Sequence, residues 1–377
     1  MQQTLNKLYN VDHYFQTSLF PHIKQELGFL TILQQKFVQA LEISKLDSLI
    51  PYVGKRKCRP TKSRMALARC FLAKAIYNIP TTQILIDRLQ SDLSLRRLCG
   101  YEKLEQIPSQ PTFSRAFDEF AQLKIAERAH ENIIKEYLGD QLIGHISRDS
   151  TAIKAREKPF KKPKKEKIAK KLGRPKNGEQ RIKQPTRLEK QYLGMTIKAM
   201  LSDLPQKCDI GTKMNSKGYK VSWQGYKFHI DCSDTGIPIS CVLTSASVHD
   251  SQVAILLATI SNQRVCSFYD LMDAAYDSPL IKQHSQSLGH IPIIDIRPKR
   301  GQKAEVEVEL KAKRNANYKT SEMVRYNQRS SVERLNGRLK DEFNARMIRV
   351  KGHTKIMSHL MFGIVALTVD QLMKYLE

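Results

Sequence analysis

Three carboxylates in the sequence, Asp149, Asp273 and Glu333, are candidates for a shared metal site. Clustered carboxylates repel one another unless a cation neutralises them, and hard oxygen ligands of this kind suit Mg²⁺ or Mn²⁺. Two such ions about 3.5 to 4 Å apart would activate a water or a 3′-hydroxyl and stabilise the departing oxygen of a phosphodiester. Each carboxylate also has an ordinary interpretation, because Asp149 could cap a turn, Asp273 could cap a loop and Glu333 could be solvated. The elements that carry these residues decide between the two interpretations.

Glu333 lies in a stretch, 326–340, whose spacing predicts a helix with two faces. At 100° per residue Tyr326, Arg329, Glu333 and Lys340 fall within an arc of about 60°. Apolar residues that would dock the helix lie about 100° further round it, at Val332, Leu335, Leu339 and Phe343. A solvated helix face shows the same charge pattern, so the spacing alone leaves both interpretations open.

The order of elements after residue 140 would bring the three carboxylates together. Strands are predicted over 142–151, 219–232, 237–245, 265–272 and 291–296, and helices over 252–260 and 278–288. Asp149 and Asp273 stand at strand ends, whereas Asp250 is interpreted as a helix N-cap. This is the order of an α/β fold of the ribonuclease H-like kind, a mixed sheet with helices. There the fourth strand lies beside the first, which would put Asp149 next to Asp273, and the last helix could bring Glu333 to them.

The charge of the chain predicts a polyanionic partner. Lys and Arg number 63 against 37 Asp and Glu in 377 residues, a formal net charge of +26. Nucleic acid is the first candidate and an anionic membrane surface the second. We expect no membrane insertion, because nothing resembles a signal peptide and the longest apolar run, 360–369, is too short to span a bilayer. Seven scattered cysteines without zinc-ligand spacing favour reduced thiols in a cytoplasm.

A basic segment interrupts the predicted core. Residues 154–176 hold 12 basic and 2 acidic residues, broken by prolines and a glycine. We therefore predict a flexible insert over 154–215 whose charge binds nucleic-acid backbone by counterion release. Gly173, Arg174, Pro175 and Lys176 resemble the core of an AT-hook, in which an Arg enters the minor groove. Leu172 precedes them where the motif has Arg, and a basic solvated linker is the competing interpretation.

The first 140 residues are predicted to be helical. Apolar residues recur at helical spacing over 62–77, and shorter helices are predicted over 81–89, 93–98 and 112–120. Short helices with tight turns are compatible with a helix-turn-helix for DNA binding or dimerisation, but equally with a helical bundle. The predicted organisation is an N-terminal domain over 1–140, a catalytic domain over 141–350 and a C-terminal helix over 351–377.

The motifs together resemble a bacterial insertion-sequence transposase of the DDE type. Tyr326, Arg329, Glu333 and Lys340 match the YREK signature of that group in residue type and spacing. The segments around 148–151 and 273–278 are similar to its first and second Asp motifs, and 223–229 and 247–251 also read like stretches of the family. The resemblance covers roughly residues 60–350.

The resemblance implies a role for each motif residue. Asp149, Asp273 and Glu333 would bind two Mg²⁺ or Mn²⁺ ions, while Arg329, Lys340 and Tyr326 would contact DNA phosphates. The implied activity is cleavage of DNA at element ends and strand transfer into a target, by a homodimer associated with the nucleoid in the bacterial cytoplasm. A ribonuclease H-like nuclease or resolvase without strand transfer is the enzymatic alternative, and a non-catalytic DNA-binding protein is the other.

Two departures from the family pattern limit what can be carried over. Some relatives cut through a hairpin intermediate and stack a flipped base on a Trp between the second Asp and the Glu. The only Trp here, Trp223, precedes Asp273, so we assume no hairpin step. Ala274 and Ala275 stand where relatives commonly have Lys-Gly, which affects local DNA contacts but not the carboxylate.

Overall fold

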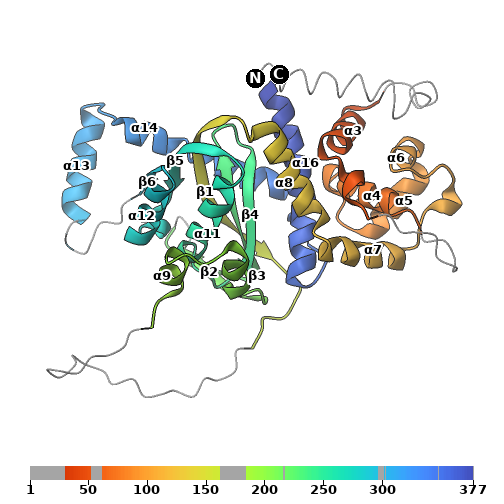
Figure 1. Cartoon of the computed structure of the whole chain (residues 1–377), viewed down its shortest axis with the longest axis horizontal. Helices are drawn as coiled ribbons and strands as arrows, with labels where there is room; N and C mark the ends of the chain where they lie inside the picture. Colours follow the sequence, from red (N-terminus) through yellow and green to blue (C-terminus); the bar gives the residue numbers. More distant parts are fainter. Residues whose placement is uncertain are drawn as a thin grey trace.

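The computed structural model of the chain describes residues 30–51, 62–161, 184–214, 217–295, 301, 303–346 and 348–376. A group of helices from the N-terminal part lies on one side of the long helix α16, His353–Leu376, and a mixed sheet with its own helices lies on the other (Figure 1). An all-α part followed by an α/β core is the fold class that the sequence predicts.

Most of the N-terminal helices begin at a side chain that caps them. The hydroxyl of Ser63 accepts a hydrogen bond from the Ala66 amide at the start of α4, and Thr81 does the same for Ile84 in α5. In chain order the segments are α3 Ile32–Ser44, the 3₁₀ turn η2 Leu46–Leu49, α4 Arg64–Ile76, α5 Thr82–Ser91, α6 Leu93–Leu98, the 3₁₀ turn η3 Leu104–Gln106, α7 Gln110–Gln122 and α8 Ile125–Leu138.

An aromatic cluster joins these helices to α16. The Phe71 ring of α4 packs against Phe113 and Phe117 of α7, at centroid distances of 5.9 and 4.8 Å, and against Phe362 of α16 at 5.9 Å. These rings are at most 6% exposed. Burial of such side chains is worth about 1.5–3 kcal/mol each, so the N-terminal helices and α16 share one core.

By length and composition α16 could cross a membrane, the one such helix in the described part of the chain, but 72% of its apolar window is buried inside the protein. The apolar run 360–369, predicted to be too short for a span, is the centre of this longer helix. It packs against α3, α4, α7, α8, β4 and α15. Its apolar character is therefore explained by its place in the core.

The described strands form one mixed sheet of six: β1 Leu142–Lys154, β2 Asp209–Met214, β3 Lys220–Ser233, β4 Pro238–Ser245, β5 Cys266–Met272 and β6 Ile291–Ile294. Their order is β2-β3-β1-β5-β6, with β4 also paired to β3. β1 is antiparallel to β3 and parallel to β5, and the register pairs Arg148 with Met272. Asp149, inside β1, and Asp273, directly after β5, therefore lie at the same level of neighbouring strands, as the sequence predicts. The predicted strand end at Asp149 is wrong, because β1 stays paired with β3 as far as Lys154.

The second part of the predicted basic insert is folded. Helices α9, Arg187–Tyr192, and α10, Ile197–Asp203, pack against α11, Ser251–Asn262, and β2 extends the sheet. Met200 and Leu204 join a buried cluster with Val253 and Leu257. These few apolar residues are enough to order the segment because α11 packs against them. The prediction of a flexible segment was therefore wrong for 187–214. Residues 162–183 lie outside the described part.

The helices that complete the core are the 3₁₀ turn η4 Ala274–Tyr276, α12 Pro279–Ser287, α13 Lys303–Asn315, α14 Ser321–Asn327 and α15 Ser330–Asp341. The predicted single helix over 326–340 is thus two helices, with Arg329 at the N-cap position of α15. Hydrogen bonds from the amides of Gln328, Arg329 and Ser331 to the carbonyl three residues earlier tighten the chain there. The apolar stripe is buried as predicted, with Val332 and Leu339 0% exposed.

Candidate active site

Helix α15 lies alongside β1, and three of its polar side chains contact side chains of β1. Ser331 donates to the hydroxyl of Ser147 at 3.4 Å, and the Asn336 amide donates to the Asp149 carboxylate at 3.2 Å. The Lys340 amine then donates to the Thr151 hydroxyl at 2.5 Å. The nine residue steps from Ser331 to Lys340 span about 13.5 Å along the helix, and the four from Ser147 to Thr151 span about 13 Å along the strand. The matching lengths allow successive contacts between helix and strand. Asp149 therefore faces α15, with helix side chains on both sides of it.

Asp149 is a partly buried carboxylate with other negative charges near it. Its side chain is 23% exposed. Burial, helped by the charges of Asp273 and Asp250, raises the pKa of Asp149 to about 6, against the lowering effect of a hydrogen bond from the Ser150 amide and of Arg329. A carboxyl with this pKa gains from a bound cation, because the cation removes the repulsion.

Arg329 lies between two of the three candidate carboxylates. Its guanidinium is 4.0 Å from an Asp149 oxygen and donates to Glu333 Oε1 at 2.5 Å. Burial opposes the charge on Arg329, but Asp149, Tyr326, Glu333 and Asp273 outweigh it and raise the pKa of Arg329. The Glu333 side chain is 56% exposed. The Asp149 and Glu333 carboxylates are therefore bridged by the Arg329 guanidinium.

Asp273 ends β5 and starts the 3₁₀ turn η4. Its carboxylate accepts a hydrogen bond from the Ala275 amide at 2.9 Å, which is the loop cap considered for it from the sequence. Tyr276, at the end of the turn, is 1% exposed and its hydroxyl has no hydrogen-bond partner among the described residues. Burial, Asp250, Asp149 and Asp273 all raise the pKa of Tyr276, so its neutral hydroxyl lies close to the acidic groups.

The predicted phosphate contacts are arranged around this point. The Tyr326 ring on α14 lies 6.0 Å from the Arg329 guanidinium. Lys340 is half-buried, and burial together with Lys213 and Arg346 lowers the pKa of Lys340. Arg174 and Lys176, the half AT-hook, lie outside the described residues.

The structure adds Asp250, which the sequence assigned to a helix cap. Asp250 occupies the N-cap position of α11, but its side chain makes no capping hydrogen bond. Instead it accepts from the Ser150 hydroxyl at 2.8 Å and lies 3.1 Å from the Lys227 amine and 3.6 Å from His229. Ser150 alternates with Asp149 along β1, so Asp250 lies across the sheet from α15. In the sequence, Ser150 directly after Asp149 and the later pair His249-Asp250 were the features that could have indicated this contact.

A buried ion pair holds the middle of β1 in place. Arg148 is 1% and Asp231 0% exposed, and their side chains make two hydrogen bonds of 2.7 and 2.8 Å. Ser261 of α11 donates to the same carboxylate at 2.7 Å. Arg148 also donates to the Met272 sulfur of β5 at 3.4 Å. The residue before Asp149 thus ties β1 to β3, β5 and α11.

The donor set fits a divalent cation in its chemistry, because hard carboxylate oxygens and the raised pKa of Asp149 favour one. The described residues contain no group of three or more His, Cys, Asp or Glu side chains close enough to hold a metal. Arg329 is the physical reason at this site, since its guanidinium separates Glu333 from Asp149. To share a cation with Asp149, Glu333 would have to exchange this arginine for the ion.

The fold and the position of these residues define a class: a ribonuclease H-like core with aspartates on two neighbouring strands, as in DDE enzymes. A family profile described as the transposase DDE domain matches residues 141–369, and one described as transposase domain DUF772 matches residues 23–119. The chain belongs to the insertion-sequence DDE transposases, a family of DNA-processing enzymes that generally use divalent metal ions. No curated protein and no solved structure is detectably similar to it.

Proposed function

We propose that this transposase cuts DNA at the ends of its element and joins the freed 3′-hydroxyl to target DNA. The observation that carries the proposal is the pair of aspartates on neighbouring strands, Asp149 in β1 beside α15 and Asp273 directly after β5, with the pKa of Asp149 raised to about 6 by burial and by neighbouring acids. Asp149, Asp273 and Glu333 would hold the divalent ions. When bound, Mg²⁺ or Mn²⁺ would activate the attacking oxygen and stabilise the departing one.

The chain's own residues would orient the DNA. Asn336 keeps the Asp149 carboxylate turned towards α15. Arg329, released from Glu333, and Lys340, next to Thr151, would contact phosphates on either side of the cut, and Tyr326 a phosphate near Arg329. The net charge of +26 supports a nucleic-acid substrate. Action on two ends would require a homodimer, and the protein would work on the nucleoid in the cytoplasm.

The test uses DNA that carries the short inverted repeats expected to flank the coding region. We expect Glu333→Gln to keep end binding and to lose Mg²⁺-dependent cleavage, because it removes a charged ligand but keeps the side-chain shape. Glu307→Gln, the same substitution at an exposed position of α13, is the matched control and should retain cleavage. Cleavage in the Glu333→Gln protein would contradict the assignment.

Strand joining separates the proposal from its alternative. Cleaved ends that never join to a target plasmid would reduce the function to that of a nuclease without strand transfer. If the wild-type chain bound the repeats but never cut them with Mg²⁺ or Mn²⁺, it would be a non-catalytic DNA-binding protein.

A further inference from the structure

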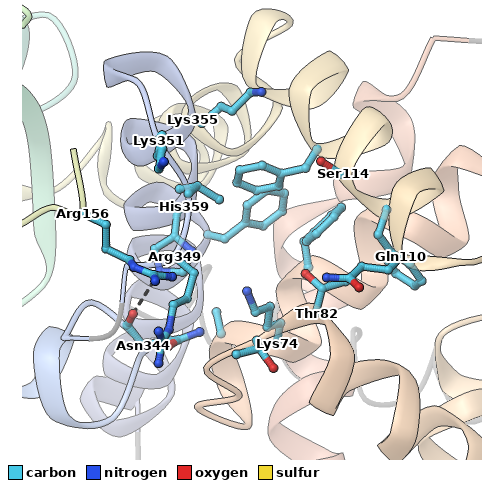
Figure 2. A pocket seen from close by; sticks show the side chains of 17 residues that line it. Lys74, Thr82, Gln110, Ser114, Arg156, Asn344, Arg349, Lys351, Lys355 and His359 are labelled. Atoms are coloured by element: carbon cyan, nitrogen blue, oxygen red, sulfur yellow. Dashed lines mark hydrogen bonds between the residues drawn. The ribbon is translucent and has the colours of Figure 1, made fainter. Parts of the chain in front are cut away.

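A cavity of about 480 Å³ lies between the N-terminal helices and the C-terminal segment, away from the carboxylates. Its walls come from α4, α5, α7, the chain after β1, the chain after α15, and α16 (Figure 2). The cationic side chains in its lining are Lys74, Arg156, Arg349, Lys351 and Lys355. No described lining residue is acidic. We call it the cationic cavity.

Lys74 is the buried charge of this cavity. It is 7% exposed, on the inner side of α4. Burial lowers the pKa of Lys74 to about 8, and no ion pair to a described carboxylate compensates it. A buried amine without a counter-charge destabilises a fold, and an anion in the cavity would supply that counter-charge.

Backbone groups in the lining favour the same kind of ligand. Thr82 and Gln110 are the first residues of α5 and α7. The amide groups of a helix N-terminus carry partial positive charge and suit an anion. No side chain caps the first turn of α7 by a hydrogen bond. Phe71, Phe117 and Phe362 give the cavity an apolar wall beside its cations.

The cationic cavity is connected to the candidate active site by cations along β1. Arg156 follows Asp149 by seven residues, about 23 Å at most at 3.3 Å per residue. Between them Lys340 contacts Thr151 and is close enough to Lys213 and Arg346 for their charges to lower its pKa. A DNA strand with one phosphate per 3.4 Å would cover this distance with about seven nucleotides.

We propose that the cationic cavity binds a backbone phosphate of the same DNA strand whose phosphodiester lies at Asp149. This proposal rests on the proposed function for the identity of the DNA. The cavity lies within the size range of small-molecule pockets, about 300–1,000 Å³, so a nucleotide fits with its phosphate at the cations and its apolar part against the phenylalanines. The N-terminal helices and α16 would thereby fix the strand relative to the carboxylates.

The experiment measures binding of the repeat DNA in EDTA by fluorescence anisotropy, over a salt series. We expect Arg349→Gln/Lys351→Gln to lower the affinity about 10-fold or more and to reduce the slope of log K against log salt by about 1 to 2, since each phosphate contact contributes about 0.9. The control Arg128→Gln/Lys198→Gln removes the same charge from exposed positions outside the cavity lining. Equal slopes for the two double variants would overturn the proposal.

Lys74→Met separates binding from folding. We expect it to weaken repeat-DNA binding while the thermal midpoint stays the same or rises, because an unpaired buried amine is replaced by an apolar group. A lower thermal midpoint with unchanged DNA affinity would mean a structural lysine and would contradict the proposal.

Inorganic phosphate distinguishes the source of the anion. If orthophosphate alone stabilises the wild-type chain and competes with the repeat DNA, the cavity takes the DNA phosphate as proposed. If it stabilises the chain without competing, the cavity is a site for a free anion and the proposal fails. Mg²⁺-dependent cleavage by the wild-type chain is measured in parallel, so a chain that binds through the cavity but never cuts would overturn only the proposed function.

Discussion

The candidate active site and the cationic cavity carry opposite charges and are built differently. Asp149 accepts a hydrogen bond from Asn336 of α15, and the residue before it, Arg148, forms a buried ion pair with Asp231. The cavity instead presents long cationic side chains, of which Arg156, Arg349 and Lys351 are exposed. Carboxylates fixed by packing suit metal binding, whereas long, exposed cationic side chains suit contacts with phosphates. The two proposals thus assign reaction and positioning to separate regions.

The largest expected effect is on cleavage at Asp149. Asp149→Asn should reduce Mg²⁺-dependent cleavage about 10⁴-fold, as expected for a member of a catalytic unit. Its DNA affinity should stay the same or rise, because a negative charge is removed. The cavity variant Arg349→Gln/Lys351→Gln should lose affinity instead. Gel-based cleavage and anisotropy measure the two, and a parallel loss of affinity in both variants would remove the distinction.

A smaller effect concerns the support beneath the site. Arg148→Met leaves Asp231 buried and unpaired, so the free energy of unfolding should fall by about 3–5 kcal/mol. The double variant Arg148→Met/Asp231→Leu replaces both charges and should recover much of that loss. Arg349→Met, at an exposed position of the cavity, should change stability by less than about 0.5 kcal/mol. Urea unfolding measures all three, and equal losses at 148 and 349 would contradict the comparison.

The smallest effect is the pH dependence of stability. Burial lowers the pKa of His229, beside Asp250, and of His359, in the cavity wall, to about 4. The unfolded chain takes up these protons near pH 6.5, but the folded chain does not until about pH 4, so stability is lost as pH falls between these values. From pH 7 to 5 each would cost at most about 2 kcal/mol.

Urea unfolding at both pH values tests this dependence. His229→Gln and His359→Gln should each reduce it, whereas His249→Gln, an exposed histidine, should leave it unchanged. A wild-type stability that does not fall from pH 7 to 5 would contradict the prediction.

Much of the fold could be predicted because its signals are local. Apolar residues at helical spacing predicted α4, and strand patterns predicted β1 and β5, although β1 continues to Lys154, beyond the predicted end. The stripe Val332 to Leu339 predicted the buried face of α15. The folded part of the insert could not be recognised in this way, because Met200 and Leu204 gain their burial from α11, more than 40 residues later.

The candidate site was predictable in its residues but not in its contacts. Asp250 has the sequence context of a helix cap, and only the packing of β1 against β3 turns it towards Ser150 and Lys227. The break between α14 and α15 at Arg329 likewise has no proline or glycine that would have predicted it. The assignment of metal and phosphate ligands stays a prediction that the variants above test.

The sequence by itself determined the class of protein: an α/β core after a helical part, an aspartate on or directly after each of two strands, a helix with Glu333, and a strongly basic balance. Those properties follow from residue types and short-range periodicity. Only the tertiary structure decided that Arg329 separates Glu333 from Asp149 and that cations from both ends of the chain surround one cavity. Such arrangements join residues up to about 280 positions apart, and their geometry is set by packing rather than by local pattern.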